Sequence, residues 1–240
     1  MQIYWTPILK IVNEAPDTYT FQLELPDGFT WDEGAHTHFA LEGFNKEDRP
    51  NRSLIRHMSI STLPREGVIG ITTRVKRECS EFKSILRGMK IGEQVAIFKT
   101  HSNVPLQRDG KNVYLLSAGV GLATFRPIVL EYLENGEGVS HLHSLNVDTS
   151  ANYLFNDVFT SSNGFTAEFV ANRSDYYAAV EMLATDQDGL YYIVGSDDFL
   201  HQTIDVLRRS GIMPEQIVLD KHDFQLDEFF TGKGENSLSS

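Results

Sequence analysis

The sequence predicts an antiparallel β-barrel followed by an α/β domain with a doubly wound parallel sheet. In the first hundred residues apolar and polar side chains alternate, as over Tyr19–Leu25 and Ile69–Val75, which is the period of half-buried strands. In the rest of the chain, continuous apolar runs alternate with helical segments, which is typical of a parallel sheet covered by helices. We therefore expect a barrel domain over 1–108, an α/β domain over 109–230 and a Gly- and Ser-rich disordered tail over 231–240.

Turn sequences divide the first hundred residues into short strands. They lie at Pro26–Gly28, Glu33–Gly34 and Pro64–Gly67, where Gly, Pro and Asp favour turn conformations. Several short strands at this spacing predict a small antiparallel barrel. One helix, Ser80–Leu86, is expected to interrupt them, followed by a strand over Val95–Phe98.

The second domain is predicted to contain five strands that alternate with helices. The last long helix carries an N-cap at Ser196, acidic residues in its first turn and Arg208 and Arg209 in its last turn. The expected strands are Val113–Leu116, His141–Leu145, Phe165–Val170, Leu190–Val194 and Ile217–Leu219. The expected helices are Leu122–Leu133, Tyr153–Phe159, Tyr176–Leu183 and Ser196–Arg209.

Composition limits the class of protein. The chain has 240 residues, of which 41% are hydrophobic, enough for a packed core. It has no apolar run near the roughly 20 residues of a membrane span and no signal-peptide pattern, so we expect a cytoplasmic protein without a membrane span. Cys79 is the only cysteine, which excludes an internal disulfide and a Cys-ligated iron–sulfur cluster. Any iron–sulfur relay must belong to a separate protein.

The net charge of −12 is concentrated in the second half of the chain. Residues 1–108 hold 14 Lys and Arg against 13 Asp and Glu, whereas residues 109–240 hold 7 against 20. The first half is locally basic over Arg49–Arg56 and over Arg74–Arg87, which suits phosphates or an acidic partner; a solvated basic face is the alternative. Because the chain is acidic overall and shows no recognition motif, nucleic acid is not an expected partner.

The segment Arg56–Thr62 combines a cation with hydroxyl groups on a predicted strand. Arg56 can hold a phosphate with a bidentate fork, and Ser59, on the same face as His57 and Ser61, can donate to a ring nitrogen. The segment therefore favours a site for a phosphate and a ring. The alternative is an arginine that forms a structural ion pair at the end of a strand.

This segment resembles the Arg-x-Tyr-Ser-x-x-Ser motif of the ferredoxin-NADP reductase family, with Met58 in place of the Tyr and Thr62 in place of the second Ser. The resemblance implies FAD as the cofactor, with FMN as an alternative. It implies that Arg56 binds the pyrophosphate, Met58 packs on the flavin ring, and Ser59 is the catalytic residue that hydrogen-bonds the flavin N5. Ser80 matches the family's helix cap. The cofactor-binding residues implied in this half are Arg56, His57, Met58, Ser59, Thr62, Thr73, Val75, Cys79 and Ser80.

A second glycine-containing segment, Ser117–Thr124, follows a predicted strand and opens a helix. Gly119 and Gly121 would allow a pyrophosphate to approach the positive helix end closely. The segment resembles the family's Gly-x-Gly-x-x-Pro, with Val120 between the glycines and Thr124 replacing the proline. The resemblance implies that these four residues bind the nucleotide.

The segment Tyr192–Phe199 resembles the family's Cys-Gly-Pro segment near the nicotinamide. Val194 stands in place of the cysteine and Ser196 in place of the proline, while Gly195 is retained. The resemblance implies that Gly195 lies at the nucleotide site. It also implies that Phe229, with Phe230, covers the open flavin face; an aromatic pair packed on the core is the alternative.

Two charged residues predict opposite nucleotide preferences. Asp148 stands where NADP-using relatives carry an arginine, and a carboxylate suits a ribose 2'-hydroxyl but repels a 2'-phosphate. Arg173 stands where the family's Ser-Arg pair also reaches that phosphate. In an acidic domain we favour NADH over NADPH.

Metal and hydrolase chemistry are not expected. The pairs His36 and His38, and His141 and His143, each share a strand face, but no carboxylate or cysteine follows at a ligand spacing. The sequence also has no Gly-x-Ser-x-Gly segment. We therefore predict no bound metal.

The resemblance implies a flavin-dependent oxidoreductase that passes hydride from NAD(P)H to FAD and then electrons to a separate acceptor. The acceptor is a ferredoxin- or flavodoxin-like protein, a partner subunit or a small molecule; a protein acceptor would dock near Arg49, Arg52, Lys83 and Arg87. The alternative is a non-enzymatic module that binds flavin or nucleotide for docking or regulation, in which the departures at Met58, Thr124, Val194 and Ser196 abolish hydride transfer.

Overall fold

The computed structural model describes residues 2–162 and 164–230, and the predicted tail lies outside them. The chain divides into two compact units, each assembled from segments that are separate in the sequence. Unit 1 consists of Met1–Leu106, Val120–Asn135 and Asn152–Thr160; unit 2 consists of Gln107–Gly119, Gly136–Ala151 and Ser161–Ser240. The domain limits at 108 and 109 stay a prediction about which parts of the chain fold independently.

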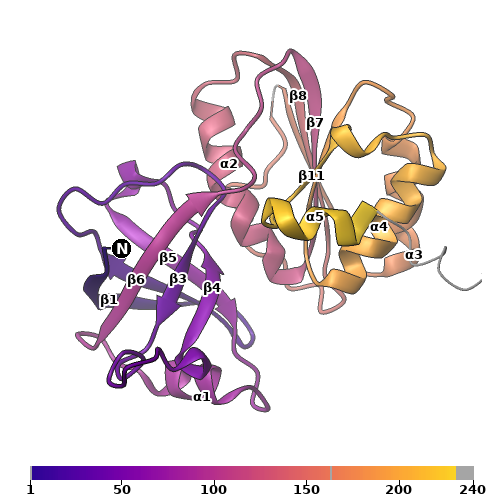
Figure 1. The fold of residues 1–240 in the computed structure, drawn as a ribbon. Helices are drawn as coiled ribbons and strands as arrows, with labels where there is room; N and C mark the ends of the chain where they lie inside the picture. The colour runs from indigo at the N-terminus through magenta and orange to yellow at the C-terminus, as the bar shows by residue number, and fades with distance from the viewer. Residues whose placement is uncertain (1, 163, 231–240) are drawn as a thin grey trace, which may run out of the picture. The chain divides into compact units, whose positions relative to one another are not determined.

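The described residues of unit 1 form a six-stranded antiparallel sheet (Figure 1) in the order β4-β3-β6-β1-β2-β5. Just after the end of one edge strand, Ile60 forms a bridge with Ile71 in the middle of the other edge strand, and Ser61 N donates to Gly70 O at 2.8 Å. The sheet therefore closes into the predicted barrel. The strands are β1 (Tyr4–Ala15), β2 (Thr18–Glu24), β3 (Ala35–Ala40), β4 (Ile55–Ser59), β5 (Val68–Arg74) and β6 (Gln94–Ser102).

The barrel core follows from the alternation of its strands. Phe21 in β2 and Ile69 in β5 point inward and are at most 2% exposed. Helix α1 (Glu81–Gly88) starts after the N-cap Ser80, whose Oγ accepts from the backbone N–H of Lys83. It buries one apolar face against this core. The predicted helix is thus confirmed, shifted by one or two residues.

Helix α2 (Leu122–Glu134) belongs to unit 1. Its Arg126 donates to Ser61 O at 2.8 Å and pairs with Glu66 at 2.8 Å, and the Arg126 guanidinium lies 5.5 Å from the centre of the Phe155 ring. Because the Arg126 side chain is only 17% exposed, these contacts are less screened than surface ion pairs. They fix the first turns of α2 to the segment that follows β4.

Unit 2 contains a five-stranded parallel sheet in the order β11-β10-β7-β8-β9, among its described residues. The chain starts in the middle at β7, adds β8 and β9 on one side, then β10 and β11 on the other, which is the predicted doubly wound order. The strands are β7 (Lys111–Ala118), β8 (Val139–Val147), β9 (Phe165–Val170), β10 (Leu190–Val194) and β11 (Ile217–Leu219). The helices are α3 (Arg173–Leu183), α4 (Asp197–Arg209) and α5 (Asp223–Phe230).

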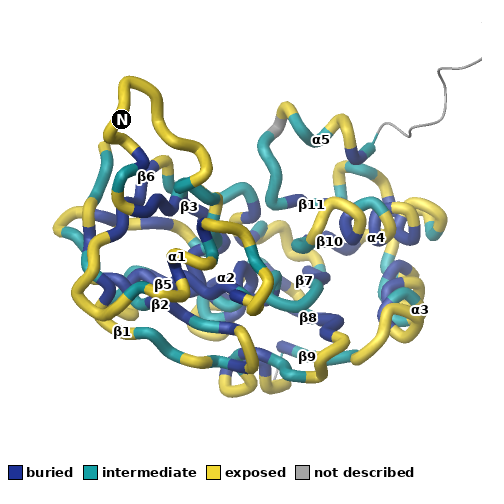
Figure 2. Tube along the Cα trace, turned by 90° about the horizontal axis from the view of Figure 1, so that it is seen from below, coloured by how far each residue is buried: buried dark blue, intermediate teal, exposed yellow. Residues whose placement is uncertain are grey.

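Helices α3 and α4 pack their apolar faces on this sheet (Figures 1 and 2). Tyr176 and Phe199 from the helices and Tyr191 from β10 are each at most 1% exposed. Ser196 caps α4 as predicted, because its Oγ accepts from Phe199 N. None of the helices in the described residues has the length and apolarity that a bilayer crossing requires.

One predicted helix is wrong. The described residues 153–159 form turns instead of a helix, and Leu154, Val158 and Phe159 are buried as anchors of this loop. Ala151 and Phe155 have φ of 53° and 55°, left-handed backbone that a right-handed helix cannot contain. The apolar spacing of this segment reflects its packing on unit 1, not helical periodicity.

Unit 2 holds a half-buried histidine, His143, in β8, next to β9. His143 Nδ1 lies 2.6 Å from Thr166 Oγ1, a hydroxyl that also contacts His141 Nε2 at 2.9 Å, and Glu168 lies 3.9 Å from His143 Nε2. Burial, with a smaller effect of the nearby His141, lowers the pKa of His143 to about 4. The folded protein therefore favours the neutral ring.

We predict that this histidine destabilises the protein in acid. Because the folded pKa lies below the ordinary value of about 6.5, the unfolded chain binds the proton more readily, and stability is lost as the pH falls from 6.5 towards 4. The loss amounts to at most about 3 kcal/mol, since Glu168 would partly compensate a protonated ring. Urea unfolding of wild type and His143→Gln between pH 7.5 and 4.5 measures it. Parallel pH dependences for the two proteins would contradict the prediction.

Candidate cofactor site

The hydroxyl of Ser59, at the end of β4, is held by a second hydroxyl. Thr124 Oγ1, in the first turn of α2, donates to Ser59 Oγ at 2.8 Å, and Thr124 is 1% exposed. Because the Ser59 oxygen accepts this bond, its own proton can be donated to another acceptor. Thr124 was predicted to bind the nucleotide; its contact with a residue 65 positions earlier had no local signal in the sequence.

Arg56 is fixed by the backbone around it. Its Nη1 donates to the carbonyls of Arg52, Ser53 and Ile55 at 3.3, 3.2 and 2.6 Å, and its guanidinium lies 5.0 Å from the centre of the Phe82 ring. Because Nη1 is hydrogen-bonded and one face of the guanidinium lies against the Phe82 ring, the guanidinium plane is held in a fixed orientation. A preorganised guanidinium suits the bidentate recognition of a phosphate.

Cations gather near the start of α1. Lys83 Nζ donates to Arg74 O at 2.6 Å. Burial lowers the pKa of Lys83, and the positive charges of Arg56, Arg74 and Lys76 lower it further. These side chains therefore repel one another, so an anion placed among them would be attracted. The first turn of α1, capped by Ser80, adds backbone N–H groups and the positive end of the helix dipole.

The other predicted flavin residues of unit 1 occupy different environments. Met58 is half-buried and packs against the barrel core. The hydroxyl of Thr62 is used within the barrel, since it donates to and accepts from the backbone of the segment that forms β5. Thr73 and Val75 are buried and Cys79 is half-buried. Their contacts with a flavin stay a prediction, as does that of the exposed His57.

In unit 2, the predicted glycine turn follows β7. Gly119 has φ of 54° and begins a 3-10 turn that ends at Gly121, so its left-handed backbone favours glycine. Asn146 Nδ2, from β8, donates to Ser117 Oγ at 2.8 Å and to Gly119 O at 3.3 Å. Asn146 was not predicted, although a polar residue within an apolar strand is a usable signal. Val120 and Gly121 begin the α2 segment of unit 1.

The two residues expected to set the nucleotide preference are both held by their neighbours. Asp148 is 4% exposed, and its Oδ1 accepts from Ser150 N at 2.9 Å and from Ser150 Oγ at 2.6 Å. Arg173, at the start of α3, donates to Tyr177 Oη at 3.2 Å and lies 4.9 Å from the centre of the Phe199 ring. The anion and the cation follow successive strands of the sheet, β8 and β9, as predicted.

Packing explains Gly195 and Phe229 without a ligand. A Cβ at Gly195 would overlap the Phe199 ring, so the position just before the N-cap of α4 favours glycine. Phe229 is 8% exposed, its ring centroid lies 4.7 Å from that of His201, and Lys221 Nζ lies 5.5 Å from the Phe229 ring. These contacts agree with the alternative of an aromatic packed on the core. The role of Phe229 over a flavin stays a prediction.

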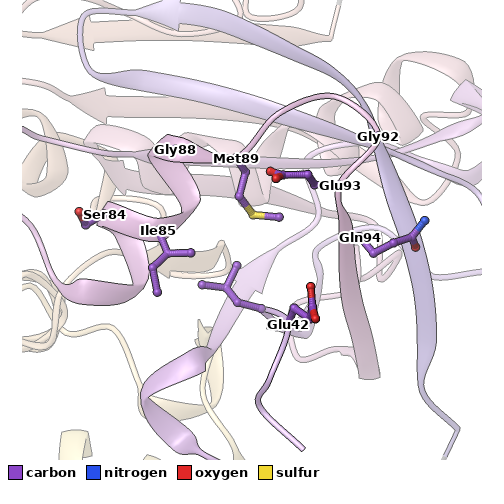
Figure 3. A pocket seen from close by; sticks show the side chains of 9 residues that line it. Glu42, Ser84, Ile85, Gly88, Met89, Gly92, Glu93 and Gln94 are labelled. Carbon is purple, nitrogen blue, oxygen red and sulfur yellow. The ribbon is translucent and has the colours of Figure 1, made fainter. Parts of the chain in front are cut away.

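A groove of about 510 Å³ lies on another side of α1 (Figure 3). Ile85 and Met89 form its apolar part, and Glu42 and Glu93 place two carboxylates at its edge. The predicted site residues are absent from its lining among the described residues. Two carboxylates would repel a phosphate, so the lining of this groove does not suit a nucleotide cofactor.

Comparison with known proteins finds similar structures but no similar sequences. No family model matches the sequence, and no curated protein sequence matches it. The CS-b5R domains of human Ncb5or (NAD+ form) align at a TM-score of 0.75 and 15% identity, over 92% of this chain and 70% of that chain.

Two reductases of other organisms are similar. A ferredoxin NADP+ reductase from Neisseria gonorrhoeae with bound FAD and NADP aligns at a TM-score of 0.75 and 16% identity, over 91% of this chain and 98% of that chain. The ferredoxin-NADP+ reductase from Plasmodium falciparum aligns at a TM-score of 0.70 and 12% identity, over 91% and 95%. At these identities the likeness concerns the fold. This chain therefore has the two-domain fold of the ferredoxin-NADP reductase-like proteins, and the predicted fold class is confirmed.

Proposed function

We propose that this protein is a flavin-dependent oxidoreductase that passes hydride from NAD(P)H to bound FAD and then electrons to a separate acceptor. The observation that carries the proposal is the Thr124–Ser59 hydrogen bond at the end of the strand that also holds Arg56, together with the mutually repelling cations near the start of α1. An oriented hydroxyl and an arginine a few residues apart would suit the ring and the phosphates of a flavin. The fold shared with a reductase that binds FAD and NADP supports the same conclusion.

Bound FAD would supply the redox chemistry that amino-acid side chains lack. Arg56 and the N-terminus of α1 would bind the pyrophosphate by charge-assisted hydrogen bonds. Ser59 would donate its proton to the ring nitrogen N5, in the direction set by Thr124. Met58 would pack a polarizable thioether against the ring.

The direct test is the spectrum of the purified protein. We expect a yellow protein whose absorption near roughly 450 nm, a property of oxidised flavins, is bleached by NADH or NADPH under anaerobic conditions. A yellow protein that neither nucleotide bleaches would instead support a flavin-binding module without hydride transfer. A colourless protein that binds no added flavin would contradict both.

We predict a preference for NADH over NADPH. Asp148 is buried and its Oδ1 accepts two hydrogen bonds from Ser150, so a 2'-phosphate placed against this carboxylate would meet a charge of the same sign. The measurement is kcat/KM for both nucleotides at a fixed acceptor concentration, in wild type and in Asp148→Arg. The variant should shift the ratio towards NADPH by about tenfold or more, equivalent to 1.4 kcal/mol.

A control variant on the surface separates the effect of Asp148 from the effect of a change in net charge. Asp205→Arg changes an exposed carboxylate of α4 and should leave the ratio unchanged. A wild type that favours NADPH tenfold would show that Arg173, not Asp148, governs the site.

We further propose that a protein acceptor docks on the basic side of unit 1. Arg49, Arg52 and Arg87 are exposed there, and Arg87 Nη1 also donates to the carbonyls of the 74–79 loop at 3.2 Å. Salt screens attraction between a basic patch and an acidic carrier, so turnover with such a carrier should fall several-fold as the salt rises from about 0.05 to 0.5 M. Turnover with a small neutral acceptor serves as the control. Equal salt responses would place docking elsewhere.

A further inference from the structure

Four of the eight histidines of the chain lie on one face of the barrel: His36 and His38 in β3, His57 in β4 and His101 in β6. The strand register places His38 opposite His57 and His36 opposite His101. The ring centroids of these two pairs are 4.0 and 4.2 Å apart, and those of His36 and His57 are 5.8 Å apart. The four imidazoles therefore form one connected cluster within unit 1.

A β-bulge in β6 brings the fourth histidine to this face. Phe98 and His101 stand opposite the two histidines of β3, so three residue steps of β6 match two of β3. Lys99 has a left-handed φ of 52°. Thr37 Oγ1 donates to Phe98 O at 3.2 Å, and Thr100 Oγ1 donates to Thr37 Oγ1 at 2.8 Å. In a regular strand, Phe98 and His101 would face opposite sides, so the bulge adds a ligand group to the cluster.

The spacing of the rings suits a shared metal ion. Imidazole nitrogens bind divalent transition metals at about 2.0–2.1 Å, which places the centroids of two tetrahedral ligand rings about 5 Å apart. The centroid distances in the cluster, 4.0 to 5.8 Å, bracket this value. One ring nitrogen of His36 also lies within 4.8 Å of one of His57. Small side-chain rotations would therefore bring two or three nitrogens onto one ion.

We propose that His36 and His57, with a third ring from His38 or His101, bind a divalent transition-metal ion such as Zn²⁺. His36 is 5% exposed and supplies a fixed ligand, while His57 and His101 are exposed and leave a path for the ion. Strands β3, β4 and β6 contain no Asp or Glu, so the ligands from them would be neutral and the bound ion would keep its positive charge. The proposal does not rest on the proposed flavin chemistry; of the four histidines, His57 is the one that is also predicted to contact a flavin.

The test is calorimetric titration of the chelator-treated full chain with Zn²⁺, together with the visible spectrum of the Co²⁺-loaded protein. We expect one ion per chain and a tetrahedral Co²⁺ spectrum. His57→Ala should raise the dissociation constant for Zn²⁺ at least about tenfold. Losing a residue that only hydrogen-bonds a metal ligand already weakens metal binding by about that factor, and losing a ligand weakens it at least as much. His57 is exposed, so this variant should keep the wild-type melting temperature.

Two further variants complete the test. The double variant His38→Ala/His101→Ala should also weaken binding at least about tenfold, because it removes both candidates for the third ligand. His201→Ala, in unit 2, is the matched control and should bind Zn²⁺ as the wild type does. Wild-type affinity in either cluster variant would overturn the proposal. So would a wild-type protein that binds no Zn²⁺ at about 100 µM, a concentration far above the dissociation constants of structural zinc sites.

Discussion

Replacing Arg56 by Ala is expected to yield a protein that purifies largely without flavin. The guanidinium is anchored by three carbonyls and the Phe82 ring, so it is oriented before a phosphate arrives. Losing a charge-assisted fork to a desolvated phosphate costs about 2–5 kcal/mol, a factor of roughly 30 to 5,000 in the dissociation constant. Titration of the flavin-free variant with FAD, followed by fluorescence quenching, measures this factor.

Two neighbouring variants sharpen the result. Arg52→Ala removes an exposed cation from the same basic segment and should bind FAD as the wild type does. Arg56→Lys keeps the charge but loses the planar fork and should fall between wild type and Arg56→Ala. A full complement of FAD in purified Arg56→Ala would show that the pyrophosphate lies elsewhere. Chromatography of the flavin released from wild type distinguishes FAD from FMN.

Removing the Ser59 hydroxyl is expected to slow flavin reduction by NADH about 10²-fold, the usual effect of deleting one oriented donor at a reacting atom. Thr124→Val removes the bond that orients Ser59 while keeping the side-chain shape, and should slow reduction about tenfold. Anaerobic stopped-flow reduction of the FAD-loaded proteins measures both rates. The apparent affinity for NADH should change little, because the Thr124 hydroxyl, although predicted to lie at the nucleotide site, donates to Ser59.

A double-mutant cycle tests whether Thr124 acts through Ser59. If it does, Ser59→Ala/Thr124→Val should be no slower than Ser59→Ala, because the orienting bond has nothing left to orient. Ser61→Ala is the matched control: its hydroxyl donates to Gly70 O inside the barrel, so it should lose stability but not rate. Independent, multiplying losses for Ser59 and Thr124 would assign Thr124 a separate role.

The fold was predictable because local patterns decide its elements. Three strands of unit 2, β9, β10 and β11, begin and end at the predicted residues, since short apolar runs bounded by polar turns leave few alternatives. The helix predicted over 153–159 failed for the opposite reason. The spacing of its apolar residues reflects their contacts with distant parts of unit 1. The left-handed backbone of Phe155 could not be predicted from the residue type.

The candidate site was predictable only where a short motif carries it. Arg56 and Ser59 lie three positions apart on one strand, so a shared site could be proposed directly from the sequence. The Thr124–Ser59 bond and the histidine cluster depend on strand register, a bulge at Lys99 and the placement of α2. These features bring together residues that are tens of positions apart, and local sequence patterns do not predict such contacts.

The segmented make-up of the barrel unit bears on how the chain is synthesised. All six barrel strands leave the ribosome before Thr124 and Arg126, the α2 residues that bind the end of β4 and the segment after it. Strand β7 of unit 2 leaves the ribosome after the last barrel strand and before α2, and its partner β8 follows later. Neither unit can therefore finish before the other has begun. The nascent chain must carry a barrel without α2 and an unpaired apolar strand at the same time, which are the surfaces that chaperones recognise.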